Sequence, residues 1–169
     1  TTPLPQCVEL LTTIPTFDHH DSLNEIKKIE YKKCIALIMT MGSESNFDSP
    51  GAYQMMDEDW DFVSDNKIKG ISPNTCVTAH ASNALSERLW NDDDAKIKDQ
   101  LVDKIKNRFN IKPEHSFLHK WLYAQSKKNL EGYFKKINSY NNSLFIAGEV
   151  FGGSKVEGAY LSGYHLAKY

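Results

Sequence analysis

The sequence predicts an α+β fold, in which helices pack on one face of a mixed, largely antiparallel sheet and the chain ends in a strand, a turn and a helix. Strand-like segments gather before and after a helical block and do not alternate with helices. Turn-rich stretches such as "SDNKIKGISPN" separate neighbouring strands. No GxGxxG follows any strand, so a complete nucleotide-binding domain is not expected.

The first half of the chain favours short helices and then strands. A proline-rich entry leads into a helix from about Gln6 to Thr12, and "SLNEIKKIE" predicts a second short helix. Residues Cys34 to Met41 are nearly all apolar, which indicates a buried strand. Shorter strands are expected at Tyr53 to Met56 and at Trp60 to Ser64. The stretch "TCVTAHA" alternates between apolar and polar residues and is a further strand.

The second half opens with the helical block and closes with strands. Apolar residues recur every four positions and predict one long amphipathic helix: Ile97, Leu101, Ile105 and Phe109. Pro113 is expected to end this block. The longest alternating strand is "HSFLHKWLYAQ", the last strand is "SLFIAGE", and a final helix begins near Val156.

The composition is that of an ordinary globular domain. Of 169 residues, 40% are hydrophobic and 25% charged, and no apolar run approaches the roughly 20 residues that span a bilayer. We therefore expect no membrane partner and a cytoplasmic location. A net charge of -2 gives no reason to expect nucleic acid. Three cysteines without metal-type spacing favour a reducing compartment. The chain opens at Thr1 without a methionine, which suggests a piece of something longer.

A carboxylate and four glycines mark the turn from the last strand to the last helix, "GEVFGGSKVEG". Glycine lets backbone approach a ligand closely, and the first N–H groups of a helix have no internal partner. The positive end of the helix dipole also favours negative charge. This turn could therefore hold a phosphate or an anionic ring, while Glu149 accepts hydrogen bonds from sugar hydroxyls. A glycine-capped connection under a terminal helix is the alternative.

Several spaced motifs resemble one family in a single order. The closing segment "FIAGEVFGGSKVEGAYLSG" resembles the C-terminal flavin motif of the flavin amine oxidase superfamily, and particularly of renalase-like NAD/FAD-dependent oxidoreductases. The segment "TTPLPQCVELL" resembles the one by which that family leaves its first nucleotide-binding half for its substrate domain. The segments "DNKIKGISPNTCVTAHAS", "SERLWNDDDAKIKDQLVDKI" and "HKWLYAQ" resemble its central hairpin, its helical block and its signature strand. Renalase-like proteins usually carry aspartate where Glu149 stands, whereas monoamine oxidases carry glutamate there.

The resemblance implies a division of the chain and a cofactor. Residues 1–142 would form a substrate-binding-like domain, and residues 143–169 the C-terminal strand and helix of an FAD-binding domain whose N-terminal βαβ half is absent. FAD would belong to the full-length parent, and this chain alone would not retain it. The helix start would point its N–H groups at the flavin N1/C2=O edge. The implied cofactor-binding residues are Gly148, Glu149, Gly153, Val156, Glu157 and Gly158.

Three further residues are implied on the substrate side. His80 ends an alternating strand; such a histidine is often structural, but the resemblance places it near the flavin, where it could orient substrate. Trp121 belongs to an aromatic row, and such a row on a strand is more often core than a binding wall. The resemblance places Trp121 and Tyr53 around the substrate as aromatic walls. The pair His19-His20 lies in a polar stretch and indicates a solvated surface, so no metal is expected.

Two functions remain open. The first is part of an FAD-dependent oxidoreductase that transfers a hydride from a small nicotinamide-like or amine substrate to flavin. The second is a non-catalytic stand-alone domain that acts as an interaction module. Under the first, the missing N-terminal half is a partner, and the final strand from about Leu144 to Glu149 has an exposed edge through which the chain could self-associate.

Overall fold

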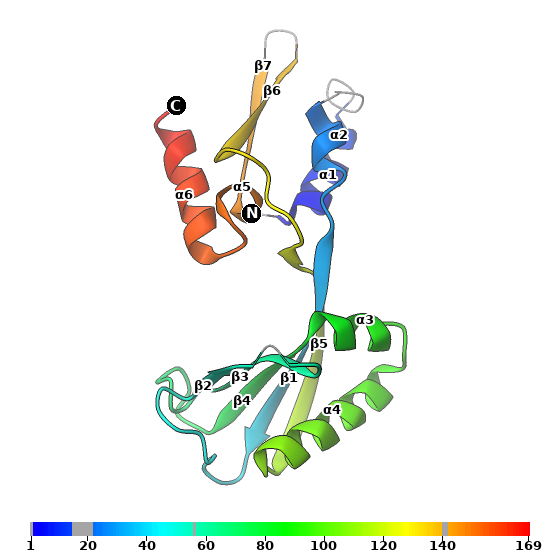
Figure 1. Ribbon diagram of the computed structural model, residues 1–169, viewed down its shortest axis with the longest axis vertical. Coiled ribbons are helices and arrows are strands. Elements are labelled where there is room, and N and C mark those ends of the chain that lie inside the picture. Colours follow the sequence, from blue (N-terminus) through cyan, green and yellow to red (C-terminus); the bar gives the residue numbers. More distant parts are fainter. Residues whose placement is uncertain (1, 15–21, 56, 140–141) are drawn as a thin grey trace. The chain divides into compact units, whose positions relative to one another are not determined.

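A computed structural model describes residues 2–14, 22–55, 57–139 and 142–169, and it divides into two compact units (Figure 1). Unit 1 contains residues 1–32 and 125–169, and unit 2 contains residues 33–124. The boundary points fall within strands β1 (Tyr31–Met41) and β5 (Pro113–Ser126). The closing strand and helix thus group with the start of the chain. That residues 1–142 and 143–169 are separate functional domains stays a prediction.

Unit 2 is built on a five-stranded sheet. The strands lie in the order β2-β3-β4-β1-β5, with β2 at Ala52–Gln54, β3 at Trp60–Asp65 and β4 at Cys76–Ala81. The pairs β1–β4, β2–β3 and β3–β4 are antiparallel. Together with the helices described next, this sheet confirms the predicted α+β class.

Two helices cover one face of this sheet, α3 (Asn83–Leu89) and α4 (Asp94–Phe109). Side chains alternate along β1, so that Ile35, Leu37 and Met39 all point toward the helices and are buried. The four-residue recurrence predicted for α4 is confirmed, because Ile97, Leu101 and Ile105 are buried in the same core. The helices therefore pack on one face, as the sequence predicts.

Polar residues define where these helices begin and end. The Asp93 side chain accepts hydrogen bonds from the backbone N–H groups of Ala95 and Lys96, and Ser82 likewise caps α3. The long helix ends at Phe109, where Asn110 takes the left-handed conformation with φ 50°. Asn110 is thus the observed end of the helix, and Pro113 begins strand β5.

Unit 1 combines helices with a two-stranded sheet. The helices are α1 (Leu4–Thr12), α2 (Ser22–Ile26), α5 (Glu149–Gly152) and α6 (Val156–Ala167). The antiparallel sheet pairs β6 (Phe134–Ser139) with β7 (Asn142–Ala147), and Ile137 stands opposite Leu144. Among the described residues, the other edge of β7 has no partner strand. Self-association through that edge stays a prediction.

Strand β6 is absent from the sequence-based expectation. Its residues Lys135 and Lys136 interrupt any apolar alternation, so the sequence pattern gives no strand signal there. The strand forms because β7 supplies six paired positions beside it. None of the described helices is both long enough and apolar enough to cross a bilayer.

We expect Ile105→Ala to destabilise unit 2 by about 2–5 kcal/mol, because this fully buried side chain would leave a cavity in the core. The matched control is Ile71→Ala, since Ile71 is 67% exposed in the same unit and should change the free energy of unfolding by less than about 0.5 kcal/mol. Urea titration with tryptophan fluorescence measures both, because all three tryptophans lie in unit 2. Equal losses in the two variants would contradict this core.

Candidate functional site

The turn that closes unit 1 contains glycines of two kinds. A Cβ on Gly152 would collide with the backbone of Gly158, and a Cβ on Gly158 would collide with the backbone of Gly152 and Gly153. These two glycines therefore serve the contact between α5 and α6. Gly153 has a φ of 104°, which residues other than glycine rarely adopt. At Gly148, by contrast, the space that a Cβ would enter is open.

Glu149 is held by a hydrogen-bonded chain. The Tyr31 hydroxyl donates to Glu149 Oε1 at 3.0 Å, and the same hydroxyl oxygen accepts from the backbone N–H of Leu4 at 3.3 Å. Burial raises the pKa of Tyr31 above its ordinary value, so the phenol keeps its proton and remains a donor. Leu4 is the first residue of α1, so this helix begins beside the same phenol that orients the carboxylate.

Helix α6 starts without a side-chain cap. Lys155 occupies the N-cap position and makes no capping hydrogen bond, while Val156 behind it is 90% exposed. The first backbone bond of the helix runs from Ala159 N to Lys155 O, which leaves the N–H groups of residues 156–158 without a helical acceptor. Glu157 adds a carboxylate to this first turn. An exposed, uncapped helix start fits a ligand that carries partial negative charge.

Ser162 fixes this turn to the strand before it. Its hydroxyl donates to the backbone carbonyl of Tyr133 and accepts from the N–H of Gly148 at 2.8 Å. Ser162 is fully buried, so both bonds are shielded from water. The rings of Tyr133 and His165 stack beside it, 3.7 Å apart between centroids. The helix and the end of β7 are therefore locked to each other around the expected cofactor residues.

Unit 2 presents a sheet face that the helices leave uncovered. His80 stands on this face with Ala36 opposite it on β1 and Phe62 opposite it on β3. The rings of His80 and Phe62 lie 5.8 Å apart between centroids. Sequence patterns could not reveal Phe62, because its place beside His80 depends on the register of β3 against β4.

Trp121 lies on β5, one strand beyond β1 in the same sheet. The residue is 53% exposed, and its ring meets that of His119 edge to face, with centroids 4.4 Å apart. Just before β1, the Glu30 carbonyl accepts a hydrogen bond from Lys127 N, which follows the end of β5. Just after β1, Gly42 lies against the side chain of Glu114 at the start of β5. The start of one strand thus lies beside the end of the other, so β5 runs antiparallel to β1. An unbroken ladder between these points would put Trp121 opposite Ala36, which also stands opposite His80. The geometry therefore puts His80 and Trp121 on one face.

Tyr53 does not join that pair. Its ring packs with Phe47 and Phe109 at centroid distances of 5.1 and 6.0 Å, next to the core under α4. Its hydroxyl accepts from the backbone N–H of Asp48 at 3.1 Å. Tyr53 pairs with Val63, whereas His80 pairs with the neighbouring residue Phe62. Because side chains alternate along a strand, Val63 and Tyr53 point to the opposite face from His80. The structure therefore places Tyr53 on the helix-covered side of the sheet.

No group of three or more metal-binding side chains is found among the described residues. The pair His19-His20 lies outside them. The three cysteines are free thiols, and burial raises the pKa of the Cys34 thiol to about 11. Such a thiol stays protonated at neutral pH and is a weak nucleophile.

Burial lowers the pKa of His80, so we expect its ring to titrate below the same ring in urea-unfolded chain. The unfolded state then binds the proton more readily. The contribution of His80 to the free energy of unfolding should therefore be complete above about pH 6.5, and the protein should lose stability as the pH drops below that value. NMR titration of the imidazole in both states measures the two midpoints. A folded midpoint at or above the unfolded one would refute the sheltered position, and His80→Gln should flatten the pH dependence of stability.

Comparison with known proteins gives a likeness in fold. No protein-family model and no curated protein matches the chain. Among solved structures, the "Putative protoporphyrinogen oxidase" of Exiguobacterium sp. 255-15 matches with a TM-score of 0.63 and 11% sequence identity. The match covers 99% of this chain and 39% of that chain. Both units thus have the fold of part of that protein, and this chain spans well under half of its length.

Proposed function

We propose that this chain is part of an FAD-dependent oxidoreductase of the flavin amine oxidase type, and more narrowly of the renalase-like kind. The observation that carries the proposal is the uncapped start of α6, directly after a turn where Tyr31 holds Glu149 in place. The fold likeness to part of a protein named as an oxidase supports it. The closing sequence motif supports it independently.

The residues of unit 1 suit a flavin in chemistry and in access. The N–H groups at the start of α6 would face the N1/C2=O edge, which carries negative charge when flavin is reduced. Glu149 has one oxygen on Tyr31, and the described residues donate no hydrogen bond to its Oε2, which can accept from a ribityl hydroxyl. When bound, FAD would supply the hydride-accepting ring. Gly158 contributes through helix packing, because the backbone of Gly152 and Gly153 fills the space that a side chain would occupy.

The open sheet face of unit 2 would hold the substrate. Trp121 offers an exposed aromatic surface on which a flat, nicotinamide-like ring could stack. His80 is largely neutral near neutral pH, because burial lowers its pKa, so it can donate or accept a hydrogen bond there without a net charge. A small amine is the second substrate class within the proposal. We leave Tyr53 out of the substrate wall, since it packs beside the helix-covered core.

An interaction module is the second candidate function. Phe117 and Trp121 are 60% and 53% exposed on the same strand, which would also suit a protein partner. The two candidates differ in the parent gene. About 150 preceding residues with a strand, a GxGxxG and a helix would favour the oxidoreductase, since that is the size of a nucleotide-binding half.

We expect the purified chain to be colourless and to lose FAD during purification. The sequence contains no GxGxxG, so the cradle that normally anchors the FAD pyrophosphate is missing. Visible absorbance and the flavin released on heating measure bound cofactor. Stoichiometric FAD in this chain would refute the expectation that an N-terminal half must complete the site.

In an FAD-loaded enzyme that contains this chain, Trp121→Ala should weaken substrate binding and slow flavin reduction together, each by roughly fivefold. An aromatic pair contributes about 1 kcal/mol beyond its buried area, and a misplaced hydride donor reacts more slowly. Stopped-flow measurement of flavin reduction gives both quantities. Leu122→Ala is the matched control, because Leu122 is next in sequence, 44% exposed and on the other side of β5.

The same enzyme separates the other assignments. Glu149→Gln should chiefly reduce FAD retention, whereas His80→Gln should leave FAD bound and change the rate or its pH dependence. If Trp121→Ala reduces flavin at the normal rate and only lowers the melting temperature, the aromatic row is structural. In that case the substrate face is wrongly assigned.

A further inference from the structure

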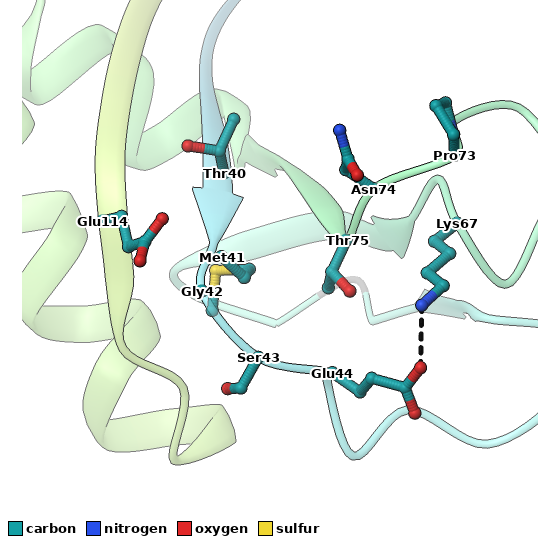
Figure 2. A pocket seen from close by; sticks show the side chains of 10 residues that line it. All are labelled: Thr40, Met41, Gly42, Ser43, Glu44, Lys67, Pro73, Asn74, Thr75 and Glu114. Atoms are coloured by element: carbon teal, nitrogen blue, oxygen red, sulfur yellow. Dashed lines mark hydrogen bonds and ion pairs between the residues drawn. The ribbon is translucent and has the colours of Figure 1, made fainter.

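Unit 2 has a polar depression of about 430 Å³ at the end of β1, which Figure 2 shows. Most of its lining residues are exposed, including Lys67 and Glu44, which form an ion pair at 2.7 Å. Water therefore satisfies the polar groups of this depression, and no ligand is inferred there. The uncovered face of the sheet in the same unit carries a different signal.

A β-bulge in β3 places a carboxylate on that uncovered face. Trp60 and Phe62 pair with two adjacent residues of β4, so Asp61 between them is one residue more than β4 supplies. Trp60 and Val63 are both buried in the core beneath the helices. In an unbroken strand, residues three positions apart would point to opposite faces. The bulge removes this conflict, because the two residues between them, Asp61 and Phe62, both lie on the uncovered side.

Backbone bonds hold this bulge, and the Asp61 side chain is not needed for it. The Asp61 carbonyl accepts hydrogen bonds from Met55 N at 3.0 Å and from Gln54 Nε2 at 2.9 Å. Within the described ranges, the Asp61 carboxylate takes part in no hydrogen bond and no ion pair. Bulges often redirect a side chain beside a functional site. The Asp61 carboxylate is thus directed to the face of His80 without a structural duty of its own.

The charge of Asp61 reaches two neighbouring groups on this face. Burial lowers the pKa of His80, and the Asp61 carboxylate opposes that shift. Burial raises the pKa of the Cys34 thiol, and Asp61 raises it further. Lys69 acts on the pKa of His80 in the opposite sense to Asp61 and more weakly, and its Nζ lies 5.7 Å from the centre of the Phe62 ring. Because Lys69 is exposed and Asp61 is partly buried, solvent screens the lysine more.

Loss of a hydride leaves any neutral donor with a positive charge. A neutral amine becomes an iminium cation and a dihydronicotinamide becomes a pyridinium cation, while the hydride carries its electron pair to the flavin. A negative charge beside the donor therefore lowers the energy of the transition state more than that of the bound substrate. The neutral ring of His80 and the indole of Trp121 provide no such charge.

We propose that Asp61 is the residue of the substrate face that stabilises the positive charge that the substrate acquires on losing a hydride. This inference rests on the proposed function, because it takes the uncovered face of unit 2 as the place where the substrate binds. The strand order β3-β4-β1-β5 puts Ala36 and His80 between Asp61 and Trp121. A flat ring above the small side chain of Ala36 would thus have Trp121 on one side and the carboxylate beyond His80 on the other.

The test titrates 1-methylnicotinamide chloride, a stable pyridinium cation, into the ¹⁵N-labelled chain and compares it with neutral nicotinamide. We expect tighter binding of the cation, with saturable amide shifts around Asp61, His80 and Trp121. Asp61→Asn keeps the size of the side chain and should weaken binding of the cation by about threefold, since charge pairs near the surface are modest. Binding of nicotinamide should not change. Salt at about 1 M should remove most of the difference between the two ligands, because it screens charge.

Three controls separate the charge of Asp61 from any effect on the fold. Asp99→Asn is the matched variant, because Asp99 is exposed on α4, which covers the opposite face, and it should leave both affinities unchanged. Lys69→Gln removes a positive charge and should strengthen binding of the cation. NMR titration of the His80 imidazole is the third control: Asp61→Asn should lower its midpoint, and Lys69→Gln should raise it.

The outcomes distinguish this inference from the function on which it rests. An unchanged preference for the cation in Asp61→Asn would overturn the role of Asp61 and leave the proposed function standing. An unchanged His80 midpoint in that variant would do the same, since it would place the carboxylate away from this face. Absence of saturable binding by both rings would contradict the substrate face itself, and with it the proposed function and this inference together.

Discussion

The alternation of side chains along β1 determines both faces of unit 2. Ile35 and Leu37 point into the core beneath α3 and α4, while Ala36 between them points to the uncovered face. Because strand side chains repeat every two residues, a shift of one position would send every apolar group to the wrong side. The pairing of Ala36 with His80 and the burial of the core therefore share one register.

The closing turn of unit 1 uses glycine for two structural reasons, which are close backbone contact and a positive φ. Gly152 and Gly158 are needed where two helices touch backbone to backbone, whereas Gly153 is needed for its positive φ. Neither demand involves a ligand. What remains available for chemistry is the carboxylate that Tyr31 orients and the uncapped start of α6. A glycine-rich motif thus combines a scaffold with a small reactive surface.

The elements that could be predicted from the sequence are those whose signal is local. The spacing of Ile97, Leu101 and Ile105 predicted α4, and the apolar run of β1 predicted a buried strand. Elements that depend on distant partners could not be predicted in this way. Strand β6 forms beside β7 despite two lysines, and Tyr53 faces the core because of its register against Val63. Likewise the Tyr31–Glu149 bond joins residues 118 positions apart, which no local pattern can reveal.

Unit 2 is an insertion within unit 1, because unit 1 takes its residues from both ends of the chain. During synthesis the first segment of unit 1 must wait for the last, so unit 2 can acquire its structure first. Its outermost strands in the sequence, β1 and β5, are neighbours in one sheet, and forming that sheet draws together the two segments of unit 1. Much of the loop-closure entropy of joining Tyr31 to Glu149 is then already lost. The sheet can thereby serve as an intramolecular template that brings the segments of Tyr31 and Glu149 close to each other.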